Sequence, residues 1–91
     1  MKIAIMTDIE GVAGVLNAKD WIYPDSRYYE QAKILLTEEV NAAIRGLYDA
    51  GATQTVVIDA HGPGAVDASR LDKRALYSRG WNLHHQFGLN D

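Results

Sequence analysis

Two short apolar runs separated by one long amphipathic segment are the feature that most limits how this 91-residue chain can fold. Residues 2–7 (KIAIMT) and residues 53–59 (TQTVVID) have the length and the aliphatic or β-branched content of buried strands. Parallel strands need a long connection between them, and that crossover is right-handed in nearly every known case. The sequence therefore predicts a βαβ unit with both strands in one parallel sheet, which is an α/β fold.

The segment between the two strands predicts one long crossover helix. Asp25 or Ser26 can act as its N-cap, and Gly51 stands where a left-handed residue would end it. Apolar residues recur every three or four positions from Tyr29 onward, while charged side chains occupy the other, solvated face. Some two dozen residues would extend on the order of 36 Å, which is longer than a compact crossover requires.

The remaining segments give weaker signals. Residues 12–24 predict a loop with one helical turn at 18–21, and residues 61–64 (HGPG) predict a turn. Residues 65–74 have a weakly helical pattern, and residues 75–78 can form a short third strand.

Composition excludes several classes of function. Nine Lys and Arg residues against twelve Asp and Glu residues leave no basic stripe for nucleic acid. No apolar run approaches the roughly 20 residues of a membrane span, and the early acids Asp8 and Glu10 argue against a signal peptide. The chain has no cysteine, so any metal site must use oxygen and nitrogen ligands. We expect one cytoplasmic domain, residues 1–91, that binds neither nucleic acid nor membrane.

Acidic and histidine side chains follow both predicted strands at the point where each strand ends. Asp8 and Glu10 come directly after the first strand. Asp59 and His61 stand at the end of the second strand with the same spacing. Residues two apart in an extended chain point the same way, and the carboxyl ends of parallel strands meet at one sheet edge. Since like charges there need a cation between them, we predict Asp8, Glu10 and His61 as metal ligands.

Zinc is the metal that this donor set favours, because imidazole suits transition metals better than magnesium or calcium. A carboxylate can bridge two ions about 3.5 to 4 Å apart, and such a pair activates water and polarises a carbonyl. Asp8, on the better fixed strand end, is the expected bridge. We expect Asp59 outside the ligand set, where it would orient His61 or cap a neighbouring backbone group.

Each of these residues also has a purely structural interpretation. An Asp just after a buried strand is often a loop or cap residue, and a His before Gly-Pro-Gly is often a plain turn residue. His84 and His85 are expected at the surface, whereas Trp21 and Trp81 are expected as core or interface anchors. Only the combination of an acid pair with an imidazole indicates a metal.

Three motifs carry a family resemblance: MTDIEGVAGV at the start, TEEVNA at residues 37–42 after Tyr29-Glu30, and VIDAHG at residues 57–62. Together they resemble the start of the M55 peptidases, the D-aminopeptidase family of dinuclear zinc enzymes. The order and spacing agree through nearly the whole chain. D-x-E-G alone is a weak signal, but its combination with T-E-E-x-N and D-x-H is fairly specific.

The resemblance implies an open three-layer α/β fold, of which this chain would be the N-terminal part, and assembly into homo-oligomeric rings. It implies a zinc-dependent aminopeptidase that removes N-terminal D residues from short peptides with two zinc ions. Asp8, Glu10 and His61 would be three of the zinc ligands. The family's other His and Glu ligands and its proposed catalytic histidine lie beyond Asp91. We therefore expect a fragment that binds metal weakly at best, with no catalytic residue assigned.

Two other functions stay open from the sequence. Haloacid-dehalogenase-type phosphatases, which bind magnesium, also carry Asp, a second acid and Gly after their first strand. In this chain Glu10 and Val12 replace their second Asp and their Thr, and His61 would have no role. Alternatively, a non-catalytic subunit or interaction module would keep the fold and part of the metal site. A dinucleotide site is disfavoured because Gly11 and Gly14 lack the G-x-G-x-x-G spacing.

Overall fold

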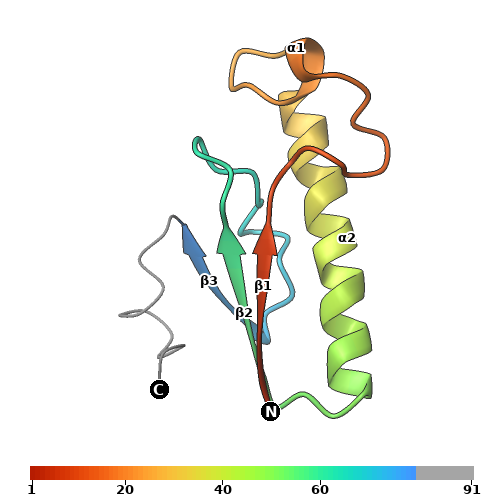
Figure 1. Ribbon diagram of the computed structural model, residues 1–91, viewed down its shortest axis with the longest axis vertical. Helices are drawn as coiled ribbons and strands as arrows, with labels where there is room; N and C mark the ends of the chain where they lie inside the picture. The colour runs from red at the N-terminus through yellow and green to blue at the C-terminus, as the bar shows by residue number, and fades with distance from the viewer. Residues whose placement is uncertain (80–91) are drawn as a thin grey trace.

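The computed structural model describes residues 1–79, and the predictions for Trp81, His84 and His85 fall outside them. Within this range the chain forms one three-stranded sheet in the order β1-β2-β3, with all strands parallel (Figure 1). The strands are β1 (Lys2–Thr7), β2 (Gln54–Asp59) and β3 (Ala75–Arg79). The predicted parallel βαβ unit and the third strand are therefore confirmed.

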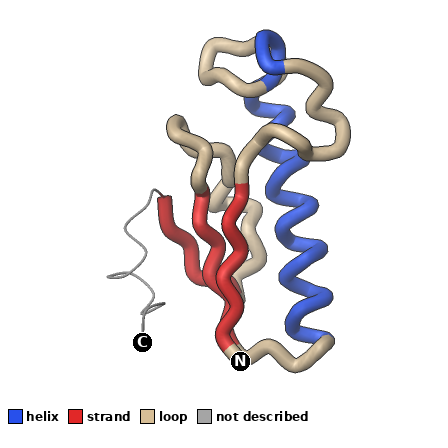
Figure 2. The backbone as a smooth tube through the Cα atoms, viewed as in Figure 1, coloured by secondary structure: helices blue, strands red, loops and turns tan. Residues whose placement is uncertain are grey.

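The crossover helix α2 (Tyr29–Asp49) covers one face of the sheet and runs antiparallel to the strands (Figure 2). Its apolar side meets every second strand residue, because alternate side chains of a strand share a face. Ile44 and Val57 are 0 % exposed in this core. The core cluster consists of Ile9, Val12, Trp21, Ile22, Tyr29, Ala32, Leu36, Val40, Ile44, Val57, Ala65, Val66 and Leu71. The expected place of Trp21 in the core is confirmed.

The C-terminal end of α2 agrees with the prediction. Gly51 adopts φ +108°, a left-handed conformation that glycine takes without steric cost. Its amide donates to Tyr48 O at 3.1 Å, and the next amide, of Ala52, donates to Leu47 O at 2.9 Å. These bonds satisfy two carbonyl groups of the last turn, which have no partner within the helix itself.

The N-terminal end of α2 differs from the prediction. The helix begins at Tyr29 rather than after residue 25 or 26, and its N-cap, Tyr28, makes no side-chain cap hydrogen bond. The hydroxyl of Ser26 is engaged elsewhere, since it accepts from Tyr23 N at 3.0 Å and donates to Lys19 O at 2.7 Å. The predicted cap was wrong because these contacts hold Ser26 in the preceding turn.

Residues 65–74 contain no helix, contrary to the weak helical pattern of the sequence. The segment crosses from β2 to β3 through turns, and α2 supplies partners for its backbone. Thr37 Oγ1 accepts from Asp67 N at 2.9 Å, and Asn41 Nδ2 donates to Arg70 O at 2.9 Å. Because side chains of α2 satisfy these backbone groups, the segment is stable without internal helical bonds.

The helix α2 extends beyond the carboxyl ends of the strands (Figure 1). Its 21 residues span about 32 Å, whereas the six residues of β1 span about 20 Å. The predicted helical turn is present as α1 (Ala18–Trp21), which packs against α2 at this end. The loop of residues 8–28 thus folds over the carboxyl edge of the sheet. No helix within residues 1–79 has the length and apolar character to cross a membrane.

Candidate metal centre

The register of β1 and β2 brings the ends of both strands to the same edge of the sheet. Thr7 pairs with Asp59, and just beyond them Ala60 N donates to Thr7 O at 2.9 Å. The chain therefore leaves β1 toward Asp8 beside the point where it leaves β2 toward His61. The two strand ends therefore meet at one edge of the sheet, as the predicted βαβ unit requires.

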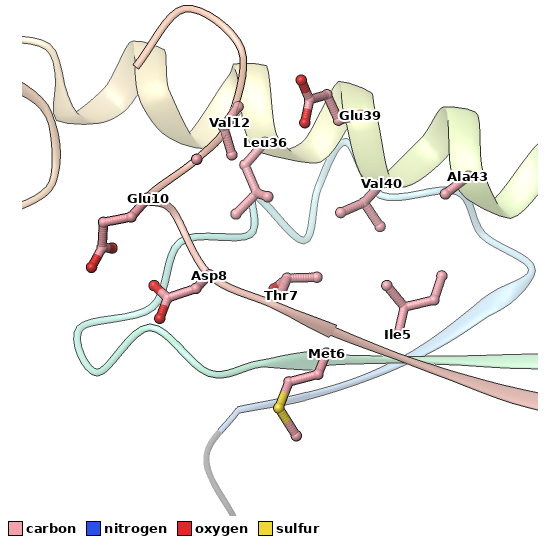
Figure 3. A pocket seen from close by; sticks show the side chains of 11 residues that line it. Ile5, Met6, Thr7, Asp8, Glu10, Val12, Leu36, Glu39, Val40 and Ala43 are labelled. Carbon is pink, nitrogen blue, oxygen red and sulfur yellow. The ribbon is translucent and has the colours of Figure 1, made fainter. Parts of the chain in front are cut away.

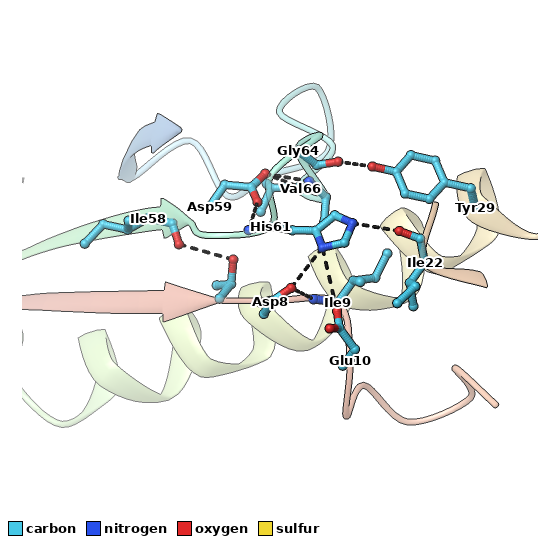
Figure 4. A network of polar contacts seen from close by, with 12 residues as sticks. Asp8, Ile9, Glu10, Ile22, Tyr29, Ile58, Asp59, His61, Gly64 and Val66 are labelled. Atoms are coloured by element: carbon cyan, nitrogen blue, oxygen red, sulfur yellow. Dashed lines mark hydrogen bonds and ion pairs between the residues drawn. The ribbon is translucent and has the colours of Figure 1, made fainter. Parts of the chain in front are cut away.

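Asp8, Glu10 and His61 form a compact group, with one donor atom from each within 4.8 Å of the others. His61 Nδ1 lies 3.0 Å from Asp8 Oδ1 and 3.7 Å from Glu10 Oε1 (Figure 4). The imidazole side chain is 10 % exposed, whereas the side chains of Asp8 and Glu10 are 50 % and 60 % exposed. The group is therefore anchored on its imidazole side and open to solvent on its acidic side.

A backbone carbonyl fixes the orientation of His61. Nε2 of the ring lies 2.7 Å from Ile22 O, and since a carbonyl oxygen can only accept, Nε2 carries a proton and donates it (Figure 4). Nδ1 is then the ring atom that faces the two carboxylates. A hydrogen bond from one ring nitrogen to a carbonyl is a common way to direct the other nitrogen at a metal.

Asp59 is not part of the group formed by the donor atoms of Asp8, Glu10 and His61. Its side chain is buried, at 1 % exposure, and Oδ2 accepts from Ala65 N at 2.7 Å and Val66 N at 2.8 Å. Tyr77 donates its hydroxyl to the same oxygen at 3.0 Å, and His61 N donates to Oδ1 at 3.3 Å. Burial and then the charge of Asp59 raise the pKa of Tyr77. Asp59 therefore caps the backbone that follows β2, as predicted.

The donor separations suit a tetrahedral zinc ion. Zinc bonds to nitrogen and oxygen of about 2.0 to 2.1 Å place neighbouring ligand atoms about 3.3 Å apart. The two distances from His61 Nδ1, 3.0 and 3.7 Å, lie on either side of that value. Asp8 Oδ1 is also fixed by Ile9 N, which donates to it at 2.7 Å. The two separations from His61 therefore fit zinc, and the donor atoms of Asp8 and Glu10, within 4.8 Å of each other, leave room for further ligands on the solvent side.

Comparison with known proteins identifies the family. Residues 1–87 match the sequence model of Peptidase M55, described as D-aminopeptidase. The chain belongs to the M55 peptidase family. A D-aminopeptidase of Bacillus subtilis (strain 168) is 35 % identical to it over 63 residues, which are 67 % of this chain and 22 % of that protein.

A solved structure supports the same assignment. The Zn-dependent D-aminopeptidase DppA from Bacillus subtilis, a self-compartmentalizing protease, superposes with a TM-score of 0.83 at 26 % identity. The match covers 90 % of this M55 chain and 30 % of the solved chain. The M55 chain thus spans less than a third of the length of these relatives, and its sheet and α2 correspond to part of that α/β fold.

In this M55 chain a further contact holds the turn that carries His61. Gly64 N donates to His61 O at 2.8 Å, which closes the turn predicted at residues 61–64. Tyr29, the first residue of α2, donates its hydroxyl to Gly64 O, and its ring centroid lies 6.2 Å from that of His61. Burial is the main cause of a raised pKa at Tyr29, so the phenol keeps its donor proton at neutral pH. The sequence offered Tyr29 as the first apolar residue of the predicted helix and as part of the family resemblance, without this role.

The helical motif TEEVN also has a structural role in the M55 chain. Glu39 Oε1 accepts from Ala13 N at 3.1 Å, which ties the loop after Glu10 to α2. Thr37 and Asn41, on the same side of the helix, hold the segment after the His61 turn. The prediction of a solvated polar face on α2 did not include these contacts. The spacing of Thr37 and Asn41, four residues apart in the motif, is the sequence signal for them.

Proposed function

We propose that Asp8, Glu10 and His61 are zinc ligands and that this chain carries the first half of a dinuclear zinc site in an aminopeptidase. The proposed reaction removes an N-terminal D residue from a short peptide. The observation that carries the proposal is the meeting of two carboxylates with a single oriented imidazole nitrogen within 4.8 Å. Membership of the M55 family supports the reaction class, and the Zn-dependent relative supports the metal.

The dinuclear part of the proposal rests on the two oxygens of Asp8. Oδ1 accepts from Ile9 N and lies against His61, whereas Oδ2 has no hydrogen-bond partner among residues 1–79. A carboxylate with one oxygen at a first ion can reach a second ion about 3.5 to 4 Å away with the other. In this proposal Asp8 would hold both ions, and further ligands of the second ion would come from outside residues 1–79.

The side chains of this chain determine where the chemistry takes place. Zinc, when bound, supplies a Lewis acid for the scissile carbonyl and lowers the pKa of water. His61 is held in one tautomer by Ile22 O, so its ring has no freedom to turn Nδ1 away. The carboxylates of Asp8 and Glu10 are 50 % and 60 % exposed, whereas the His61 ring is 10 % exposed, so the site is open to a peptide on its acidic side. A substrate therefore approaches from the acidic side of the site.

Metal content of the purified chain tests the ligand set. The variants Asp8→Ala, Glu10→Ala and His61→Ala should each lower the zinc stoichiometry measured by dialysis and atomic emission, because each removes one of three donors. Asp25→Ala is the matched control, since Asp25 is an exposed acid outside the site, and it should bind zinc as the wild type does. Full zinc occupancy in Asp8→Ala or His61→Ala would exclude that residue from the site.

Release of D-Ala from D-Ala peptides in the presence of zinc tests the reaction. Stoichiometric zinc without release would favour a non-catalytic module. Magnesium-dependent release of phosphate from an ester would favour the phosphatase hypothesis. That hypothesis has less support because it gives no role to His61, whose ring nitrogen lies 3.0 Å from Asp8.

Homo-oligomeric assembly of the whole protein is part of the same proposal. It is supported by the Bacillus subtilis relative, which is described as a self-compartmentalizing protease. Light scattering coupled to size-exclusion chromatography measures the assembly directly, and a monomer at micromolar concentration with zinc present would contradict it.

A further inference from the structure

A pocket of about 180 Å³ lies beside the candidate metal ligands, between the chain that follows β1 and the short helix α1. The residues that line this loop pocket include Glu10, Val15, Leu16, Asn17 and Ile22. Glu10 is also a proposed metal ligand, and the carbonyl of Ile22 holds the ring of His61 (Figure 4). The loop pocket therefore shares two of its residues with the site where the proposed reaction would take place.

Aliphatic side chains form much of the wall of the loop pocket. Val15, Leu16 and Ile22 all line it, and Leu16 is 80 % exposed, so contact with an apolar group would remove its side chain from water. Asn17 also lines the pocket, but its Oδ1 already accepts from Asp20 N at 2.9 Å. The pocket therefore suits an apolar group better than a polar one.

Hydrogen bonds within the loop hold the walls of the pocket in place. Val15 N donates to Val12 O at 3.0 Å, which closes a turn on one side of the pocket. Ile22 N donates to Ala18 O at 3.0 Å and ends α1 on the other side. A pocket that is already formed costs little ordering free energy when a ligand binds.

The volume of the loop pocket limits its occupant to one side chain. A cavity of about 150 Å³ is enough for a benzene molecule, whereas sites for whole drug-sized ligands have roughly 300–1,000 Å³. At about 180 Å³ the loop pocket has room for a branched aliphatic side chain and is too small for a whole peptide.

A larger cavity of about 300 Å³ also reaches the acidic residues but leads away from His61 (Figure 3). Asp8 and Glu10 lie at one end of it, and Ile5 and Ala43 lie toward the other end, between β1 and α2 (Figure 3). Its lining does not include Ile22, the residue that orients the His61 ring. Of the two cavities, only the loop pocket contacts the metal group from both Glu10 and Ile22.

We propose that the loop pocket binds the side chain of the N-terminal residue of the peptide and selects an apolar one. This assignment rests on the proposed function. Cleavage after the first residue places the carbonyl carbon of that residue at Asp8, Glu10 and His61, and its side chain is only one atom further away. The side chain must therefore enter a cavity that adjoins these ligands.

Methyl NMR spectra of the 91-residue chain test the binding of such a side chain. D-leucine amide, which has the amine, side chain and carbonyl of a first residue, is added in the presence of zinc. The methyl signals of Val15, Leu16 and Ile22 should shift together and reach saturation. D-asparagine amide has nearly the same shape but a polar side chain, so it should bind roughly 10-fold more weakly.

A pair of leucine substitutions separates the pocket from the metal group. Leu16→Ala should weaken the binding of D-leucine amide roughly 5-fold or more, because it removes apolar contact area from the pocket wall. Its zinc affinity should stay at the wild-type value, since Leu16 is not among the candidate ligands. Leu76→Ala is the matched control, because Leu76 is 47 % exposed on β3 and lies outside the pocket, and it should change neither affinity.

The ring signal of His61 reports zinc binding in the same spectra and separates the two proposals. If this signal responds to zinc and D-leucine amide then shifts Val40 and Ala43 in place of Leu16, the side chain occupies the larger cavity and the inference is overturned. Equal affinity for the two amides, or no methyl shift with zinc bound, would also overturn it. A His61 signal that does not respond to zinc would reject the metal centre and, with it, the role of the pocket.

Discussion

Replacement of Asp59 by alanine should destabilise the chain more than any exposed acidic substitution. The buried carboxylate accepts from Ala65 N at 2.7 Å, Val66 N at 2.8 Å and Tyr77 OH at 3.0 Å. Asp59→Ala leaves the two short, buried backbone donors unpaired, at roughly 1–3 kcal/mol each, or about 2–6 kcal/mol together. At 91 residues the whole free energy of unfolding is roughly 5–14 kcal/mol. The single change thus removes a large part of the stability.

Urea unfolding followed by circular dichroism measures this loss. Asp59→Asn keeps one acceptor oxygen in the same place and should lose less, about 1–3 kcal/mol. Asp25→Ala, an exposed acid without these contacts, should stay within about 0.5 kcal/mol of the wild type. If the free energy of unfolding of Asp59→Ala also lies within about 0.5 kcal/mol of the wild-type value, the capping role of Asp59 is refuted.

Three further outcomes are expected. Gly46→Ala should stabilise the chain by about 0.5–1 kcal/mol, because Gly46 is inside the helix and the new Cβ meets no atom. Gly51→Ala should destabilise it by about 1 kcal/mol, because a residue with a Cβ is strained at φ +108°. Thermal unfolding measures both, and equal shifts would contradict the argument. Burial and a neighbouring carboxylate raise the pKa of Tyr77 above its unfolded value, so its stabilising contribution is complete below about pH 10 and is lost as the pH rises further. Unfolding of Tyr77→Phe should depend less on pH in that range, and an unchanged alkaline profile would be evidence against it. Tyr29→Phe removes the hydroxyl that holds the 61–64 turn and should weaken zinc binding roughly 10-fold with the fold intact, as titration calorimetry can show.

The strands and the place of the candidate site were predictable because they depend on local pattern and on one topological rule. The run Lys2–Thr7 is a strand with the predicted bounds, as the short aliphatic pattern indicates. It is not the fully buried strand that was predicted, because Lys2, Ala4 and Met6 are exposed and α2 covers only the other face. Parallel pairing then requires the residues after both strands to meet at one edge. Asp8, Glu10 and His61 are close together for that reason.

The errors came from hydrogen bonds between side chains and backbone groups that the local sequence pattern does not show. The weak helix expected at residues 65–74 is absent because Thr37 and Asn41 of α2 satisfy backbone groups of that segment. The expected cap at Ser26 failed because its hydroxyl binds backbone atoms of the preceding turn. Local propensity is weak in such short segments, so these contacts determine the conformation.

The sequence by itself determined which side chains are available as metal donors and which sheet edge they occupy. Only the tertiary structure decided how those side chains point. Ile22 O is 39 residues from His61 in the chain, yet it determines which ring nitrogen faces Asp8. Asp59 has the same spacing from His61 as Asp8 has from Glu10, but buried amides bind it in place of a metal. The physical reason is that a hydrogen-bonding group binds the partners that packing brings to it, and packing depends on the whole fold.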